Sequence, residues 1–144
     1  MNEQTRRILS VLPHIHPGAS EEAIRSIQES VTIDLPVSYL QFLRFSNGIE
    51  GPIGRNNYVQ LWPAEEVVQE TIGYGGGKYA PGLLMIGSNG GNVVYGLDLR
   101  EANPVGGAFV EMDFIGLDWE DVFYRTETFD TFIQYLVEAE LPDT

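Results

Sequence analysis

The residues with the clearest chemical potential are the carboxylates between Glu111 and Asp130, a stretch in which Arg125 is the only basic residue. Such a concentration of acids suggests calcium, but the stretch lacks the Asp-x-Asp-x-Asp-Gly loop with a closing Glu. A protein interface is the other functional interpretation, because an aromatic anchor with a charged rim is typical of interfaces. We expect a partner-binding site made of one tryptophan and five carboxylates: Glu111, Asp113, Asp118, Trp119, Glu120 and Asp121. A solvated edge without a partner is the alternative that the sequence leaves open.

Two further pairs of residues could do chemistry, and for both a structural role is favoured. His14 and His16 have metal-binding spacing, but their surroundings fix no further ligand, so we expect no metal site. Glu65 and Glu66 could act as paired acid and base. We expect them instead in the first turn of a helix from Pro63 to about Ile72, where carboxylates complement the helix dipole.

The glycine-rich stretch Gly73–Lys78 resembles a phosphate-binding loop. In the P-loop pattern, however, Ile72 would occupy the first glycine position and Tyr79 the hydroxyl position, so the stretch is predicted to be a flexible loop. The chain also lacks cysteine, a G-x-S-x-G elbow and an H-E-x-x-H motif. We therefore expect neither a cofactor nor enzymatic activity; carboxylate-only catalysis stays a formal alternative because acids are abundant.

The overall charge restricts the kinds of partner. Eight basic residues face 21 acidic ones, which gives a formal net charge of −13, and Lys78 is the only lysine. A nucleic acid or an anionic membrane surface would be repelled, whereas a cationic protein would be attracted. No apolar run approaches the about 20 residues that span a bilayer, and no secretory h-region follows Met1. We expect a soluble, cytoplasmic protein.

The stretch from Leu35 to Gly48 is predicted to form the central helix of the core. Pro36 suits the first turn of a helix, and Asn47-Gly48 suits its end. Only every third residue between them is polar, so this helix should be buried on most sides. Ser20 is expected to cap the helix that precedes this central helix. That preceding helix should cover the central helix with three apolar residues, Ile24, Ile27 and Val31.

Short apolar runs predict strands, and the chain ends on another helix. Strands are expected at 58–62, 83–86, 93–99 and 108–113, with a hairpin turn at 88–92 and a turn at Asn103-Pro104. In the strand 108–113, Phe109, Glu111 and Asp113 should form an acidic, solvated face, opposite a packed face. A short helix is expected at 5–12, and Thr128 should cap a last helix that ends near Leu141-Pro142 and has an apolar stripe: Phe129, Phe132, Ile133, Leu136 and Val137.

The ordered set of these features resembles the SUKH superfamily, of the Smi/Knr cell-wall-regulator type, from about Ser20 to Leu136. The matching positions are Ile24, Leu35-Pro36, Tyr39, Phe42-Leu43, Asn47-Gly48, Leu61-Trp62 with Glu65-Glu66, Ile86-Gly87-Ser88-Asn89-Gly90-Gly91, Leu97-Asp98-Leu99, and Phe129 with Phe132. The departures are Gln28 where the family tends to have Glu, Thr32 where Gly is usual, and Gly91-Asn92-Val93 where Gly-Gly-Asp is frequent.

The resemblance implies an α+β fold in which a mostly antiparallel sheet is flanked by N-terminal, central and C-terminal helices. Together with the chain length, it predicts one domain over residues 1–144, with a core at 20–141 and an N-terminal extension at 1–19. Bacterial members of the superfamily recur as immunity proteins that neutralise a toxin from a neighbouring cell, and fungal members are regulatory binding proteins.

Our leading hypothesis is therefore a non-catalytic immunity protein that binds a basic toxin domain, often a nuclease, through its acidic surface. A regulatory scaffold that binds an endogenous protein is the alternative, and the sequence does not separate the two.

Overall fold

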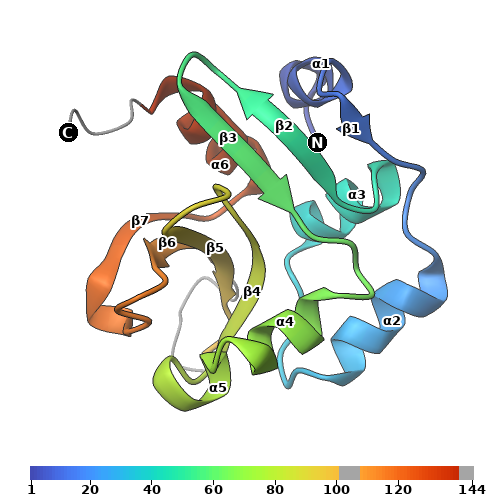
Figure 1. The fold of residues 1–144 in the computed structure, drawn as a ribbon. Coiled ribbons are helices and arrows are strands. Elements are labelled where there is room, and N and C mark those ends of the chain that lie inside the picture. Colours follow the sequence, from blue (N-terminus) through green and yellow to red (C-terminus); the bar gives the residue numbers. More distant parts are fainter. Residues whose placement is uncertain (101–107, 140–144) are drawn as a thin grey trace.

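A computed structural model describes residues 1–100 and 108–139 of the chain. In these residues, seven strands form one antiparallel sheet, and each strand pairs with its neighbours in chain order, from β1 to β7 (Figure 1). The strands are β1 His14–Ile15, β2 Ile49–Ile53, β3 Asn57–Leu61, β4 Leu83–Ser88, β5 Val93–Asp98, β6 Ala108–Asp113 and β7 Val122–Thr126. The α+β prediction with an antiparallel sheet is confirmed.

Helices occupy the connections and both ends of the described chain. They are α1 Glu3–Ser10, α2 Glu21–Glu29, α3 Val37–Phe45, α4 Val67–Gly73, α5 Gly76–Tyr79 and α6 Phe129–Glu138, with a 3-10 turn η1 at Trp119–Asp121. The predicted caps are confirmed, since Ser20 accepts a hydrogen bond from the Ala23 amide and Thr128 accepts one from the Thr131 amide. These side chains satisfy amides that the first helical turn leaves unpaired.

The larger core lies between the sheet and the helices α3 and α6, and we call it the helix-side core. Aromatic rings link its parts: Phe42 of α3 stacks on Phe129 of α6 with centroids 4.6 Å apart, and Phe109 of β6 stacks on Phe132 at 5.5 Å. Tyr39, Phe42 and Leu43 are buried, as predicted for the central helix. Val37, at its start, is 68 % exposed, so the helix is less enclosed than expected.

The opposite face of the strands is also packed, against what we call the turn-side core: Ala80, Leu83, Met85, Val94, Val110, Met112 and Leu117. The prediction of an acidic, solvated face on β6 was therefore wrong. Phe109 points into the helix-side core, where it is fully buried, and Met112 into the turn-side core. Both faces are apolar because α6 covers one and the turn between β6 and β7 covers the other.

Two connections differ from the sequence prediction. The helix α4 begins at Val67 rather than at Pro63, because the Asn47 side chain holds the preceding turn: its Oδ1 accepts from the Ala64 amide at 2.7 Å and its Nδ2 donates to Glu65 at 2.8 Å. The prediction that Glu65 and Glu66 lie in the first helical turn was therefore wrong, since Glu65 precedes the helix and Glu66 is its N-cap residue.

The stretch from Gly73 to Lys78 is not simply a loop, because it ends α4 and begins the single-turn helix α5. Gly75, with φ +80°, permits this reversal.

The ends of other predicted elements also differ. Helix α2 stops at Glu29, so Val31 follows it and packs at the border of the helix-side core. Within the predicted extension 1–19, α1 and β1 form, and Leu9 and Leu12 are buried. The predicted turn at Asn103-Pro104 and the expected helix end at Leu141-Pro142 lie outside the described residues, and α6 ends at Glu138.

The aromatic stack between α3 and α6 should dominate stability. Phe42→Ala is expected to lower the free energy of unfolding by about 3–5 kcal/mol, because it leaves a cavity beside Phe129. Urea denaturation would measure the change, with Val37→Ala in the same helix as the control that costs little. Equal losses in the two variants would contradict this description of the core.

Candidate partner-binding surface

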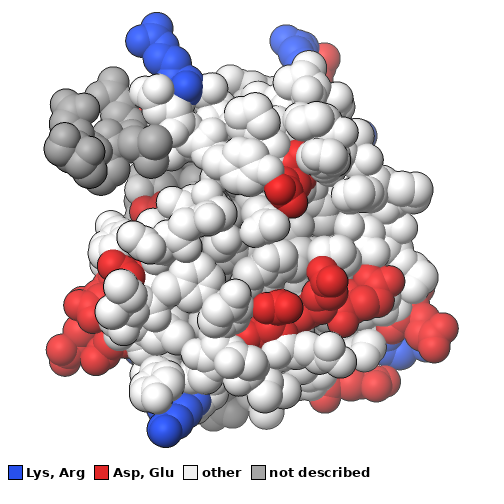
Figure 2. Space-filling view, viewed as in Figure 1, with Lys and Arg blue, Asp and Glu red and all other residues white. Residues whose placement is uncertain are grey.

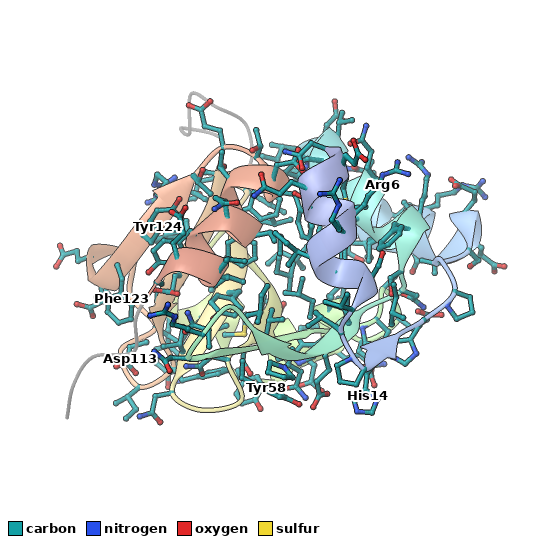
Figure 3. The ribbon with its side chains drawn as sticks, turned by 90° about the horizontal axis from the view of Figure 1, so that it is seen from above. Arg6, His14, Tyr58, Asp113, Phe123 and Tyr124 are labelled. Carbon is teal, nitrogen blue, oxygen red and sulfur yellow. The ribbon has the colours of Figure 1, made fainter. Side chains whose placement is uncertain are left out.

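Four of the predicted site residues lie together at the end of β6 and in the turn that leads to β7. Asp118, Glu120 and Asp121 are exposed, and Asp113 is half-exposed. Figure 3 shows Asp113 near Phe123 at one margin of the molecule, away from His14. We call this region the β6–β7 surface and define it by four carboxylates and two apolar residues: Asp113, Asp118, Glu120, Asp121, Ile115 and Phe123.

Two of the four carboxylates of the β6–β7 surface are held by hydrogen bonds to backbone amides of the turn. Asp113 Oδ1 accepts from the Ile115 amide at 2.8 Å, and Asp118 Oδ1 accepts from the Glu120 amide at 3.0 Å, which caps η1. Such short-range bonds are the reason why Asp is favoured in turns. The side chains of Asp113 and Asp118 are therefore held at defined positions at the two ends of the turn.

Two exposed apolar side chains lie among these acids, and the sequence analysis missed both. Ile115 is 87 % exposed and Phe123 is 56 % exposed. Met112 of β6 pairs with Val122 and Glu111 pairs with Tyr124, so Phe123 lies in a bulge between them. Phe123 is exposed between its half-buried neighbours Val122 and Tyr124. The combination of apolar centre and acidic rim is what protein interfaces commonly use.

Glu111 is separate from this surface. It faces α6, is half-buried, and accepts a hydrogen bond from the Tyr135 hydroxyl at 2.8 Å. Burial raises the pKa of Glu111, and the hydrogen bond from Tyr135 offsets only part of that rise. Its predicted place on a solvated face was wrong, because it shares the α6 side of the strand with Phe109.

Trp119 is held by the protein's own residues. Its indole Nε1 donates to the Pro81 carbonyl at 2.8 Å, and the Arg100 guanidinium lies 3.9 Å from its ring centroid. The ring is half-exposed and packs against the turn-side core. It braces the turn that carries the β6–β7 surface.

A wholly buried carboxylate, which the sequence analysis did not single out, fixes Arg100 in turn. Asp98 Oδ2 accepts from Arg100 Nη2 and from Arg125 Nη2, each at 2.8 Å. Burial raises the pKa of Asp98, but the hydrogen bonds from Arg100 and Arg125 outweigh this and hold it below its usual value. Asp98 thereby ties β5 to β7. In the sequence, the only sign of this buried charge is that Asp98 follows the mostly apolar run that begins at Val93.

A second acidic region covers α4 and the start of α2, and Figure 2 shows carboxylates gathered there as well as near the β6–β7 turn. Glu22 and Glu65 line a groove of about 550 Å³ between α2 and α4. Glu50 and Glu66 line a neighbouring cleft of about 190 Å³. Hydrogen bonds from Tyr58 and Gln60 lower the pKa of Glu50 and keep it charged.

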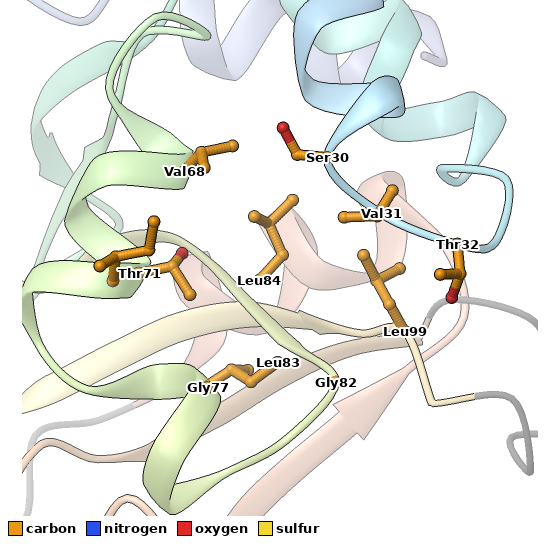
Figure 4. A pocket seen from close by; sticks show the side chains of 11 residues that line it. Ser30, Val31, Thr32, Val68, Thr71, Gly77, Gly82, Leu83, Leu84 and Leu99 are labelled. Carbon is orange, nitrogen blue, oxygen red and sulfur yellow. The ribbon is translucent and has the colours of Figure 1, made fainter.

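An apolar groove of about 320 Å³ separates the α2–α3 connection from α4 and β4 (Figure 4). Val31, Val68 and Leu84 supply much of its wall, and the described residues that line it include no charged side chain. The Thr71 hydroxyl already has hydrogen-bond partners within the protein, since it donates to the Val67 carbonyl at 2.7 Å and accepts from the Met85 amide at 2.9 Å. These residues provide no acid–base group.

Neither metal nor membrane sites are evident in the part of the chain that the structure describes. Within residues 1–100 and 108–139, no three His, Asp or Glu side chains gather in a way that could hold a metal ion. Among the same residues, no helix is long and apolar enough to cross a membrane.

The fold and the exposed surfaces define an acidic α+β protein whose β6–β7 surface has the composition of a protein-binding site. The chain belongs to the SMI1/KNR4 family (SUKH-1), because the model of that family matches residues 18–135, which is more than half of the chain. The resemblance seen in the sequence is confirmed. No curated protein matches the chain significantly. Membership of this family is consistent with a protein-binding role.

Removal of the buried charge at Asp98 should be costly. Asp98→Asn is expected to lower the free energy of unfolding by about 3 kcal/mol near neutral pH, because two arginines lose their shared carboxylate. Since the folded-state pKa of Asp98 is depressed, its contribution is present above the unfolded pKa of about 3.9 and is lost as the pH falls further. Urea denaturation from pH 3 to 7 measures this, with exposed Asp34→Asn as the control. A loss that does not depend on pH would contradict the assignment.

The charge of Glu111 should affect stability in the opposite direction to that of Asp98. The folded-state pKa of Glu111 is raised, so its ionisation destabilises the folded protein increasingly as the pH rises above about 4.3, the unfolded value. Glu111→Gln keeps an acceptor for the Tyr135 hydroxyl but removes the buried charge. The stability of this variant relative to the wild type should therefore increase between pH 4 and pH 7 in thermal unfolding. A relative stability that falls over this range would show that the charged form is the favoured one.

Proposed function

We propose that this chain is an immunity-type protein that binds and neutralises a cationic protein toxin, such as a nuclease, without catalysing a reaction. The observation that carries the proposal is the β6–β7 surface, where Ile115 and Phe123 are exposed among four carboxylates. The net charge of −13 and the family membership support it.

The physical basis is complementarity of charge and shape. A nuclease must hold phosphates, so its active cleft is positive, and an acidic protein that docks there excludes the substrate. Exposed apolar side chains supply the desolvated centre of such an interface, and the surrounding charges set its orientation and association rate. Glu120 and Asp121 supply charge, whereas Trp119 supports the turn through its hydrogen bond to the Pro81 carbonyl.

The first experiment is growth rescue in a bacterial host. The product of the adjacent gene is expressed inducibly, with and without this protein. Toxicity relieved only by co-expression, together with co-purification of the two proteins, would establish immunity and identify the partner. If the product is harmless, or if it is toxic and not rescued, that neighbour is rejected and an endogenous partner, as in a regulatory scaffold, becomes the better explanation.

Charge reversal then tests the assigned surface. Glu120→Lys with Asp121→Lys should weaken the affinity for the rescued toxin by about tenfold or more, because attractive rim charges become repulsive. Glu22→Lys with Glu66→Lys is the matched control, since it changes the net charge equally on the α2–α4 side. Isothermal titration calorimetry measures both variants. A loss of affinity confined to the control variant would assign the binding site to the acidic region of α2 and α4 instead.

A further inference from the structure

Three aromatic rings from distant parts of the chain form a row beside the β6–β7 surface. Tyr74, in the connection from α4 to α5 (Figure 1), contacts both Trp62, which follows β3, and Phe114, which follows β6. The ring centroids of Trp62 and Tyr74 are 6.3 Å apart, and those of Tyr74 and Phe114 are 4.8 Å apart. We call these three residues the aromatic row. Because Phe114 lies between Asp113 and Ile115 in the chain, the row continues the β6–β7 surface.

The three rings differ in how they are held. Trp62 and Phe114 are half-buried and pack against the turn-side core, so they are anchored in the fold. Tyr74 belongs to neither core, and 49 % of it is exposed. An exposed ring that is fixed between two anchored rings loses little freedom when a partner stacks on it, which favours binding. Tyr74 is therefore the ring of the row that is open to a partner.

Negative charge flanks the aromatic row on two sides. Glu70 precedes Tyr74 by four positions, and the Tyr74 amide donates to the Glu70 carbonyl at 3.0 Å, so the two side chains lie on the same side of α4. Next to Phe114, the Asp113 carboxylate is held by the Ile115 amide at 2.8 Å. A cation on the Tyr74 ring would meet both the ring face and these carboxylates.

The protein itself shows which cation suits such a place. The Arg100 guanidinium lies 3.9 Å from the Trp119 ring centroid and is paired with the Asp98 carboxylate at 2.8 Å. Among the residues that the structure describes, no lysine or arginine lies over a ring of the aromatic row. A planar guanidinium can stack on a ring and pair with a carboxylate at once, whereas the ammonium of lysine is a compact, more strongly hydrated charge. An arginine from outside the chain therefore fits the row best.

We propose that Tyr74 binds an arginine side chain of the cationic partner, stacked on its exposed ring beside Glu70 and Asp113. The inference deepens the proposed function and rests on it for the identity of the partner. The interface then has two parts: Ile115 and Phe123 meet apolar side chains, and Tyr74 meets a charged one. Tyrosine is among the residue types that contribute most to binding energy at interfaces.

A peptide titration tests the site without the toxin. The probe is acetyl-tetra-arginine amide, and the matched peptides are tetra-lysine, with equal charge, and tetra-citrulline, with nearly the same shape and no charge. In NMR spectra at pH 7 and low salt, tetra-arginine should shift the Trp62 indole resonance with an apparent Kd roughly two- to fivefold lower than that of tetra-lysine. Tetra-citrulline should cause no such shift. The indole of Trp119, which the protein's own residues hold, is the internal reference.

Substitutions at Tyr74 separate the ring from general attraction by the acidic protein. Tyr74→Ala should weaken tetra-arginine binding by roughly two- to fivefold, whereas Tyr74→Phe, which keeps the ring, should retain it. Tyr79→Ala is the matched control, because Tyr79 is an exposed tyrosine of α5 whose ring already has Lys78 5.2 Å from its centroid. Thermal unfolding checks that each variant is folded.

Two results would overturn the proposal: Tyr74→Ala binding tetra-arginine as tightly as the wild type, or tetra-lysine or tetra-citrulline binding as tightly as tetra-arginine. Either result would show that the ring does not select a guanidinium. Growth rescue together with a failed titration would reject the arginine site alone. A successful titration without rescue would support the site and reject the tested toxin.

Discussion

The pairing of the buried Asp98 carboxylate with two arginines is the interaction on which the β6–β7 end of the molecule depends. The carboxylate is held by Arg100 and Arg125, so it connects β5 to the edge strand β7. Arg100 then lies over Trp119, whose indole is hydrogen-bonded to Pro81 ahead of β4. A buried charge is stable only when it is paired and hydrogen-bonded. Its requirement for partners thereby orders the turn that displays the exposed acids.

The strands β4, β5 and β6 are packed on both faces, and this determines which of their side chains remain available to a partner. The helix-side core takes Phe109 and half-buries Glu111, while the turn-side core takes Met112. At this end of the sheet, exposed groups lie in the β6–β7 turn and on the edge strand β7. The bulge at Phe123 adds an aromatic side chain to that exposed set. The residues that pack the cores and the residues of the proposed binding surface are thus different residues of the same strands.

Features that depend on neighbouring residues in the chain could be predicted from the sequence. The central helix, the caps at Ser20 and Thr128, and the hairpin around 88–92 are of this kind, since local hydrogen bonds and apolar spacing decide them. The two packed faces of β6 could not be predicted from its alternation, because they depend on α6 and on the following turn. The pairing of Asp98 with Arg125 is likewise fixed only by the order of the strands.

The central claim is that the partner covers the β6–β7 surface. Hydrogen–deuterium exchange of the full chain, alone and with the toxin identified by growth rescue, tests it most directly, because slowed exchange reports the backbone groups that become covered or ordered. The account predicts slowed exchange at residues 113–126, with the amides of α2 and α4 unchanged. Slowed exchange confined to α2 and α4 would contradict it and would assign binding to the other acidic region.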